Sequence, residues 1–432
     1  MNELGDRPTL ENLMERDKRH LWHPLTQHKL SPDTLPIVRA QGALLFDASG
    51  RQYLDGIASW YTCMYGHCHP YILERVIAGM HVLDQVVFSG FTHEPAIRLS
   101  EELIKVLPGN QQKLFFSDNG STATEIGIKM ALQYHHNRGQ KKRKLLLALE
   151  EGFHGDTFGA MSASGLSVYN GPFEDFFIEV ERLPVPTPGN IEGLLGTLEE
   201  RLKRGDVAGF IYEPLVQGAA GMKMHDARGL DRILALLQGH GVLTIADEVM
   251  TGFGKTGKLF ASDHLEHSPD IICLSKALTA GLLPMGLTSC SQEVYDAFYS
   301  DDIGKGLFHG HTYSANPLAC TAALAALELL QGGDIQKRIR NITAWHREFQ
   351  QEMDRHPKVA TTRVLGVIFA LDLKDDLERY GERRGRLFQH FMDQGVFLRP
   401  LGGTLYILAP YIIEREQMER IYEAIRSALE WV

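Results

Sequence analysis

Cysteine is scarce in this 432-residue chain and is not arranged for disulfide bonds. The five cysteines are an odd set without the spacing of a disulfide framework: Cys63, Cys68, Cys273, Cys290 and Cys320. This usage is typical of a reducing compartment, so we expect a cytoplasmic location.

One short stretch does gather residue types that bind metals. "CMYGHCHP" holds Cys63, His67, Cys68 and His69, a set that could suggest zinc. Adjacent residues of an extended chain point to opposite sides, however, and rarely converge on one ion. No second pair of ligands follows at the spacing of a zinc finger. We interpret the stretch as a loop and expect no metal site.

The chain also lacks an excess of positive charge and a long apolar run. Its 44 basic and 54 acidic side chains give a net charge of −10, which favours neither nucleic acid nor an anionic membrane as a partner. No apolar run approaches the length of a membrane span. The N-terminus, "MNELGDRPTLENLMERDKRH", is polar and has no signal-peptide core, so export is not expected.

Two short apolar runs in the middle of the chain each lead to a residue with useful chemistry. Val242–Ala246 leads to Asp247, and Ile271–Leu274 is followed closely by Lys276. Both runs are short and rich in β-branched residues, which predicts buried strands. A lysine amine can condense with an aldehyde, and a neighbouring acid can hold a protonated pyridine nitrogen. The alternative is an ordinary pair of polar residues at strand ends, where loops are polar anyway.

Strand-like and helix-like segments alternate from residue 113 onward. "KLFFS", "KLLLALE" and "VAGFIYE" read as strands, and "STATEIGIKMALQYHHN" has a helical face at Ile126, Met130 and Tyr134. This alternation favours an α/β fold with a mostly parallel, doubly wound central sheet. Ligands of such sheets bind beyond the carboxyl ends of the strands. That edge would gather Gly120, Ser121, His154, Asp156, Glu213, Gln217, Asp247 and Lys276.

The pattern changes after about residue 330. An amphipathic helix, "IQKRIRNITAWHREFQQEMDRH", precedes short strands and a closing helix, which is typical of a small α+β domain. We expect the N-terminal strands to join it. The predicted division is 1–58 as the N-terminal part of the small domain, 59–328 as the large domain with the ligand edge, and 329–432 as the C-terminal part of the small domain.

"SDNGSTATE" predicts a phosphate site. Gly120 and Ser121 lie between a strand and a helix, where free backbone N–H groups and the helix dipole attract anions. Glycine permits close approach, and the serine hydroxyl adds a donor. The alternative is a plain helix cap formed by Ser121 with Glu125 nearby. Thr312, in the loop "HGHTYSANP", could supply a second donor.

Together these residues resemble those of the class III (ω-type) aminotransferases, which depend on pyridoxal 5′-phosphate (PLP) and have PLP fold type I. The resemblance covers nearly the whole chain, and its motifs are "SDNGSTATE", "GFHGDTFGAM", "EPLVQGAAGM", "ADEVMTGFGKTGKLFA", "SKALTAG" and "HGHTYSANPLAC". It implies a PLP-binding large domain and a homodimer.

The resemblance also implies roles for particular residues. Lys276 would hold PLP covalently and move the reacting proton, and Asp247 would pair with the pyridine nitrogen. Gly120 and Ser121 would bind the phosphate, with Thr312 reaching across from the other subunit. Phe153 would stack on the cofactor ring, next to His154. The substrate-binding residues would be Trp60, Tyr61, Asp156, Gly310, Arg399 and Tyr406, with Arg399 pairing with a carboxylate.

Within the class, three segments are most similar to the aminotransferases of biotin biosynthesis: "RHLWHPLTQ", "ASWYTCMYGHCHP" and "FLRPLGGTLYILAPYII". These enzymes aminate the keto acid 7-keto-8-aminopelargonic acid, usually with S-adenosylmethionine as donor and in a minority branch with lysine. The chain departs from the common pattern at Leu25, Phe153, Lys255 and His311, which leaves the donor open. Another ω-aminotransferase, acting on a diamine, an amino-aldehyde or a β-amino acid, is the alternative. A catalytically idle scaffold is a third, although the intact Lys276 and Asp247 argue against it.

Overall fold

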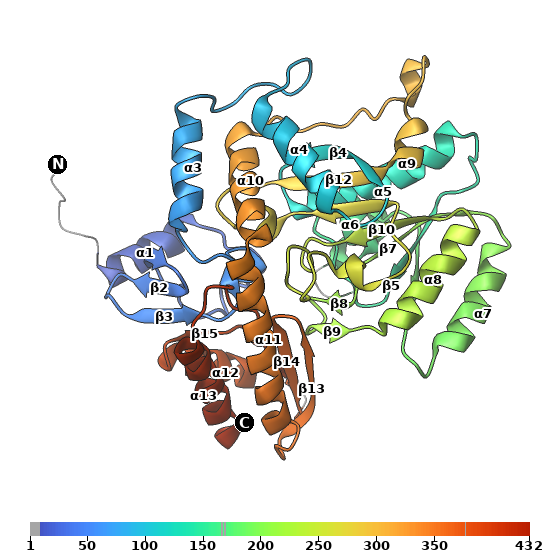
Figure 1. The fold of residues 1–432 in the computed structure, drawn as a ribbon. Coiled ribbons are helices and arrows are strands. Elements are labelled where there is room, and N and C mark those ends of the chain that lie inside the picture. Colours follow the sequence, from blue (N-terminus) through green and yellow to red (C-terminus); the bar gives the residue numbers. More distant parts are fainter. Residues whose placement is uncertain (1–8, 166, 168–169, 376) are drawn as a thin grey trace.

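The computed structural model describes residues 9–165, 167, 170–375 and 377–432. The first eight residues of the polar N-terminal segment therefore lie outside the described residues. The chain folds around a central sheet, with smaller sheets and the last helices grouped to one side of it (Figure 1).

The central sheet has seven strands in the order β4-β12-β11-β10-β7-β5-β6. In this sheet β12 runs antiparallel to both of its neighbours, and the other pairs are parallel. The prediction of a mostly parallel sheet is confirmed. The strands are β4 (Gln111–Ser117), β5 (Leu145–Leu149), β6 (Val180–Leu183), β7 (Val207–Tyr212), β10 (Leu243–Asp247), β11 (Ile271–Leu274) and β12 (Gly286–Ser291).

Helices cover both faces of this sheet, as a doubly wound fold requires. On one face lies α5 (Gly120–Asn137), whose Ile126, Met130 and Tyr134 are buried in one core cluster with alternate strand residues such as Leu146 and Ile245. The predicted helical face is therefore confirmed. The other face packs into a larger core cluster with α3 (Pro70–Met80), α4 (Glu94–Val106), α7 (Ile191–Leu202), α8 (Ala227–Gly239) and α10 (Pro317–Gln331).

The two ends of the chain share one of the smaller sheets. β3 pairs in parallel with β15, with Leu54 opposite Val396, so the expectation that the N-terminal strands join the C-terminal part is confirmed. The division at residues 58 and 328 stays a prediction. The smaller sheets contain β1 (Ile37–Gln41), β2 (Leu44–Asp47), β3 (Gln52–Asp55) and β15 (Val396–Phe397), then β13 (Val359–Leu365), β14 (Ile368–Leu373) and β16 (Thr404–Ile407), and finally β8 (Val216–Gln217) and β9 (Lys223–Met224).

The other helices lie along the whole chain, and the long helices α11, α12 and α13 belong to its C-terminal part. The remaining α-helices are α1 (Leu10–His20), α2 (Ala58–Tyr61), α6 (Phe158–Ala163), α9 (Gln292–Asp296), α11 (Gly333–Met353), α12 (Glu382–Asp393) and α13 (Arg415–Trp431). The 3-10 helices are η1 (Gly171–Phe176), η2 (Ala261–His264), η3 (Lys276–Thr279) and η4 (Ile303–Lys305). Across the described residues, no single helix is both long and apolar enough to span a membrane; α10 and α11, bent by 66°, meet those two criteria only as a pair.

Candidate active site

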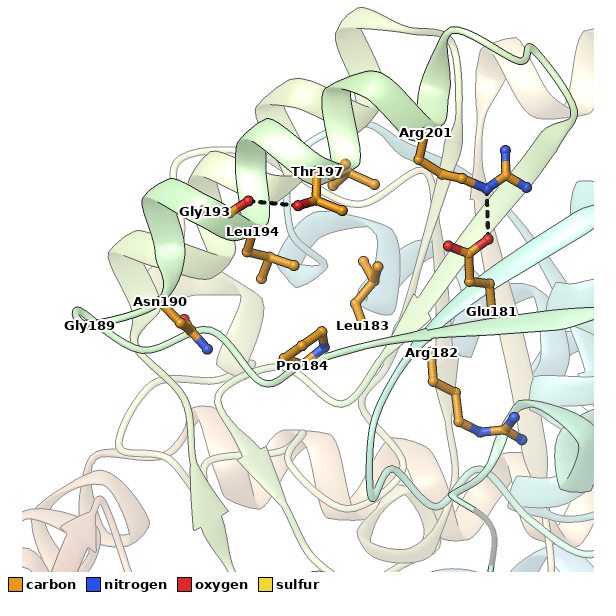
Figure 2. Close-up of a pocket in the computed structure, with 11 residues that line it drawn as sticks. Glu181, Arg182, Leu183, Pro184, Gly189, Asn190, Gly193, Leu194, Thr197 and Arg201 are labelled. Atoms are coloured by element: carbon orange, nitrogen blue, oxygen red, sulfur yellow. Dashed lines mark hydrogen bonds and ion pairs between the residues drawn. The ribbon is translucent and has the colours of Figure 1, made fainter.

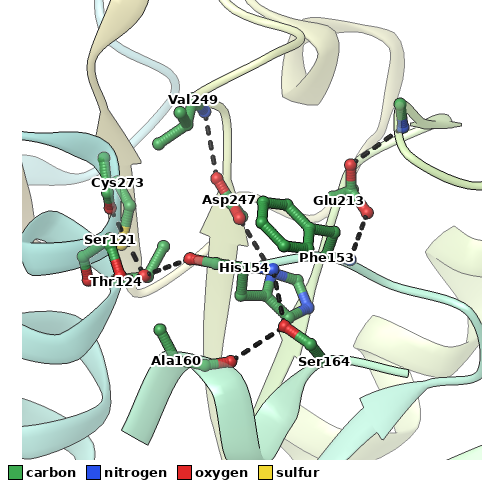
Figure 3. Close-up of polar contacts among 12 residues, drawn as sticks. Ser121, Thr124, Phe153, His154, Ala160, Ser164, Glu213, Asp247, Val249 and Cys273 are labelled. Atoms are coloured by element: carbon green, nitrogen blue, oxygen red, sulfur yellow. Dashed lines mark hydrogen bonds and ion pairs between the residues drawn. The ribbon is translucent and has the colours of Figure 1, made fainter. Parts of the chain in front are cut away.

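Asp247 and His154 form a buried pair at the carboxyl edge of the central sheet (Figure 3). Asp247 is the last residue of β10, and its Oδ2 lies 2.8 Å from His154 Nδ1. Its Oδ1 accepts a hydrogen bond from the Val249 N–H at 3.1 Å. Since both side chains are removed from water, these bonds hold the carboxylate in one orientation at the mouth of the sheet.

Glu213 adds a second buried carboxyl group, one residue after β7. Its Oε2 accepts a hydrogen bond from the Phe153 N–H at 3.0 Å, and its Oε1 accepts one from the Gly218 N–H at 2.9 Å. Burial raises the pKa of Glu213 to about 7; His154 opposes the shift and the charge of Asp247 adds to it. This carboxyl group therefore changes protonation near neutral pH.

Lys276 leaves the sheet at the same edge as Asp247, because β10 and β11 are parallel neighbours. It is the first residue of η3, and its φ of 49° lies in the left-handed region. Its Nζ lies 5.5 Å from the ring centroid of Tyr61. Burial lowers the pKa of the Lys276 amine, although the charges of Asp247 and Glu213 raise it. A lowered pKa enlarges the uncharged fraction, which is the form that attacks a carbonyl group.

Helix α5 begins at this edge and leaves two backbone N–H groups without an intrahelical acceptor. Asn119 Oδ1 accepts a hydrogen bond from the Thr122 N–H at 2.9 Å, and the Asn119 N–H donates to Thr122 Oγ1 at 3.2 Å. This capping box leaves the N–H groups of Gly120 and Ser121 for a ligand, at the positive end of the helix dipole. A Cβ at position 120 would lie 2.7 Å from Val249 Cγ1, so a larger residue would displace Val249 or the helix end.

The Ser121 hydroxyl contacts the loop that carries Asp156. Its Oγ accepts hydrogen bonds from the N–H groups of Asp156 at 2.9 Å and Thr157 at 2.8 Å, and it donates to Thr157 Oγ1 at 3.0 Å. The sequence predicts this hydroxyl as a phosphate donor. It does not predict these contacts, because they join the start of α5 to residues 35 and 36 positions further along the chain. They fix the loop against α5 and leave Asp156 exposed.

A second cluster adjoins Lys276 and contains the three aromatic residues predicted to bind substrate, Trp60, Tyr61 and Tyr406. Tyr61 Oη donates a hydrogen bond to Tyr406 Oη at 3.0 Å, and Arg399 Cζ lies 4.7 Å from the ring centroid of Trp60. Tyr406 lies in β16, and Arg399 follows β15. A guanidinium group stacked on an indole can still use its fork of N–H donors to bind a carboxylate.

The turn that carries these aromatic residues, α2, is left-handed. The φ angles are 47° at Ala58, 46° at Ser59, 71° at Trp60 and 69° at Tyr61. Left-handed helical backbone costs roughly 1–2 kcal/mol per residue when the residue is not glycine. The Tyr61 N–H donates to the Ile57 carbonyl at 2.8 Å and closes the turn. The sequence does not predict this conformation, because no glycine or asparagine marks it.

Three polar residues in or next to this turn are absent from the predicted site: Asp55, Ser59 and His67. Asp55 ends β3 in the way that Asp247 ends β10, so its position at the end of a strand could have identified it. His67 belongs to the stretch interpreted as a loop. Its side chain lies 2.8 Å from Asp55 Oδ2.

Gly310 and Thr312 lie on an exposed loop that precedes α10. The Thr312 carbonyl accepts a hydrogen bond from Gln85 Nε2 at 3.0 Å. The predicted roles of both residues toward a second subunit stay predictions.

The departures from the common family pattern fall in different environments. Lys255 is fully buried and its Nζ donates to the Gly252 carbonyl at 2.9 Å. Burial lowers the pKa of Lys255 to about 7, and the charge of Lys276 acts in the same direction. His311 Nε2 lies 3.0 Å from His309 Nε2. Leu25 lies on the exposed N-terminal segment.

A cavity of about 510 Å³ lies elsewhere, between β6 and α7 (Figure 2). Glu181 and Arg201 form an ion pair at 2.6 Å along its wall. No predicted site residue lines this cavity. We therefore place the candidate active site at the carboxyl edge of the central sheet.

The groups at this edge fit PLP. The cofactor carries an aldehyde, a ring nitrogen and a phosphate, and the edge offers Lys276, Asp247 and the α5 N-terminus respectively. His154 Nε2 is buried and has no hydrogen-bond partner among the described residues, which leaves it available to a bound group. Phe153 is 40% exposed and presents an aromatic ring at the same place. When bound, PLP would supply an electron sink for a carbanion.

The fold and these groups define a PLP-dependent aminotransferase. Residues 26–429 match the family described as aminotransferase class-III, and the chain belongs to that family.

Relatives with known names agree with this assignment. The chain is 44% identical over 420 residues to adenosylmethionine-8-amino-7-oxononanoate aminotransferase from Synechococcus elongatus, covering 95% of this chain and 98% of the relative. The enzyme of the same name from Geobacter sulfurreducens is 35% identical, with 98% of both chains covered. The crystal structure of the enzyme of that name from Methanocaldococcus jannaschii superposes with a TM-score of 0.90 at 31% identity, covering 97% of this chain and 98% of the other. A PLP-bound amine transaminase from an uncultivated Pseudomonas species superposes with a TM-score of 0.88 at 30% identity, covering 95% and 98%.

Proposed function

We propose that this chain transfers an amino group to 8-amino-7-oxononanoate, also called 7-keto-8-aminopelargonic acid, in biotin biosynthesis, with S-adenosylmethionine as donor. The observation that carries the proposal is the stacking of Arg399 on Trp60, beside Tyr61, Tyr406 and Lys276. This cluster offers a carboxylate-binding fork and an aromatic wall next to the reactive amine. Relatives named for this reaction, at up to 44% identity, support the choice of acceptor.

The residues around the reacting carbon would divide the chemistry among them. Lys276 would attach the cofactor aldehyde and, once released, act as the base that moves the proton. Asp247, oriented by His154, would keep the ring nitrogen protonated. The N–H groups of Gly120 and Ser121 would bind the phosphate.

The substrate side of the site would use a different set of residues. Arg399 would pair with the acceptor carboxylate through its fork of donors. Trp60, Tyr61 and Tyr406 would line the aliphatic chain, and Asp156 and Gly310 would complete the pocket.

The acceptor is tested with purified protein, PLP, S-adenosylmethionine and the keto acid, with the diamine product measured by mass spectrometry. We expect product with this keto acid and much less turnover of ornithine or γ-aminobutyrate. Preference for either of those amines, with no product from the keto acid, would favour another ω-aminotransferase.

Lysine is a second candidate donor, because Leu25, Phe153, Lys255 and His311 depart from the common pattern. A half-reaction separates the two donors: the yellow PLP enzyme is mixed with S-adenosylmethionine or with lysine, and bleaching is followed. We expect bleaching by S-adenosylmethionine. Bleaching by lysine alone would reassign the donor and leave the acceptor unchanged.

A homodimer in the cytoplasm is part of this proposal. Large apolar side chains are exposed on the segments around Gln85 and Thr312: Val82 at 85%, Phe91 at 63%, Tyr299 at 79% and Phe308 at 74%. A second subunit covering this region would remove that apolar surface from water.

A further inference from the structure

A partly buried hydrogen-bonded cluster joins Ser59, in the left-handed turn α2, to Asp55 and His67. Asp55 Oδ2 accepts a hydrogen bond from Ser59 Oγ at 2.8 Å and lies 2.8 Å from His67 Nε2. Asp55 Oδ1 lies 3.3 Å from the Ile57 N–H, and Ser59 Oγ lies 3.4 Å from His67 Nε2. Ser59 is therefore the member of the turn whose side chain bonds to the Asp55–His67 pair.

The Asp55–His67 pair is fixed to the sheet formed by β1, β2, β3 and β15. Asp55 is the last residue of β3 and is fully buried. The His67 backbone exchanges two hydrogen bonds with Gly42, at 3.0 Å and 2.7 Å. Although burial opposes the charge on His67, its hydrogen bonds to Asp55 and Cys63 prevail and raise its pKa to about 10. The His67 side chain is thus charged across the neutral pH range, and its backbone is fixed to Gly42.

The turn has a backbone conformation that its own residues do not favour. Its four residues have positive φ angles, and neither alanine, serine nor an aromatic residue favours this conformation. Strained backbone persists when surrounding contacts determine it, and such contacts are found next to functional residues. The residues after Ser59 in the turn are Trp60 and Tyr61, which contact Arg399 and Tyr406.

We propose that Asp55 and His67 are positioning residues for the substrate pocket. Through Ser59 they hold the left-handed turn, and the turn places Trp60 under Arg399 and Tyr61 beside Lys276. Loss of the anchor should misplace the aromatic wall and leave the PLP-binding groups of the central sheet in position. This inference rests on the proposed role of Arg399, Trp60 and Tyr61 in binding the acceptor.

The test compares Ser59→Ala with Ser49→Ala in the PLP-loaded enzyme. Ser49 is the matched control, since its hydroxyl also donates to a buried aspartate of the same sheet, Asp47, at 2.6 Å. We expect Ser59→Ala to raise KM for the acceptor about tenfold while kcat and the absorbance of bound PLP change less than twofold. Ser49→Ala should leave all of these values unchanged.

A second readout needs no turnover. Hydrogen exchange of a peptide covering residues 57–64 should be at least tenfold faster in Ser59→Ala than in Ser49→Ala. His67→Gln keeps a neutral donor and should give a smaller rise in KM than Ser59→Ala. An unchanged KM, a fall in kcat alone, or equal exchange in the two serine variants would overturn the proposal. Failure of both Ser59→Ala and His67→Gln to fold would assign the cluster to folding, which also overturns it.

Failure of the proposed function gives a different result. In that case the wild-type enzyme does not aminate the keto acid, and the serine comparison is made with the acceptor that it does turn over. Because the exchange measurement is independent of substrate, the two outcomes remain separate.

Discussion

At the scale of single residues, Lys276 is the amine at the sheet edge that adjoins both Asp247 and the aromatic cluster. Lys276→Ala should lower turnover at least 100-fold, since both the covalent attachment and the general base are lost. The fold should persist, because the Lys276 side chain takes no part in the backbone hydrogen bonds of η3 and β11. Steady-state kinetics and circular dichroism measure the two effects. Lys203→Ala, at an exposed lysine paired with Glu200, is the control and should be fully active.

Glu213 predicts a pH dependence of stability. Its folded-state pKa is about 7, above the ordinary value of 4.5, so between these pH values the folded protein binds more protons than the unfolded chain. The stability that Glu213 contributes is therefore present below pH 4.5 and is lost as pH rises through 7. A shift of this size corresponds to up to about 3 kcal/mol.

We expect Glu213→Gln to gain thermal stability relative to the wild-type protein as pH rises from 5 to 8. Scanning calorimetry at several pH values measures the difference in Tm. Glu101→Gln, on an exposed part of α4, is the matched control and should show no such trend. A constant difference between Glu213→Gln and wild type at all pH values would contradict the prediction.

At the scale of elements, the start of α5 is the part of the fold that would bind phosphate. Gly120→Ala should weaken PLP retention about tenfold, because the added Cβ would lie 2.7 Å from Val249 Cγ1 and shift the end of the helix. Dialysis followed by absorbance measures the cofactor that remains bound.

Gly193 provides the control for this substitution. It lies in α7 and is exposed, and a Cβ added there would meet no other atom within 4 Å. Gly193→Ala should leave PLP retention unchanged and stabilise the helix by roughly 0.5–1 kcal/mol. Equal retention in the two variants would show that the start of α5 does not hold the phosphate.

At the scale of the whole molecule, the proposed homodimer would place Thr312 of one subunit at the active site of the other. Mixed dimers test this arrangement. One chain carries Lys276→Ala, and Thr312→Ala is added either to that chain or to its partner. The active site with an intact lysine should lose PLP affinity only when both substitutions are on the same chain.

The opposite pattern, with loss only when the substitutions are on different chains, would show that Thr312 serves its own subunit. Analytical ultracentrifugation of the wild-type protein provides the control for assembly. An active monomer would contradict the dimer, since exposed apolar side chains such as Val82 and Phe308 would then have no partner.

The sequence alone is sufficient to predict five of the seven central strands, β4, β5, β7, β10 and β11, and the common edge of Asp247 and Lys276. It does not predict β6 or the antiparallel β12. Asp247 and Lys276 each follow a short apolar run, and parallel strands bring their carboxyl ends to the same edge whatever the strand order. The buried face of α5 is predictable for a similar reason, because Ile126, Met130 and Tyr134 recur at the helical period. Local pattern determines these features.

Only the tertiary structure decided which of those residues touch. His154 pairs with Asp247 across 93 positions, and Tyr61 bonds to Tyr406 across 345. These contacts depend on strand order and on the packing of the two chain ends, which no local period encodes. The left-handed turn at Trp60 is the sharpest example. Its residues do not favour positive φ, and Tyr61 within the turn bonds to Tyr406 near the other end of the chain.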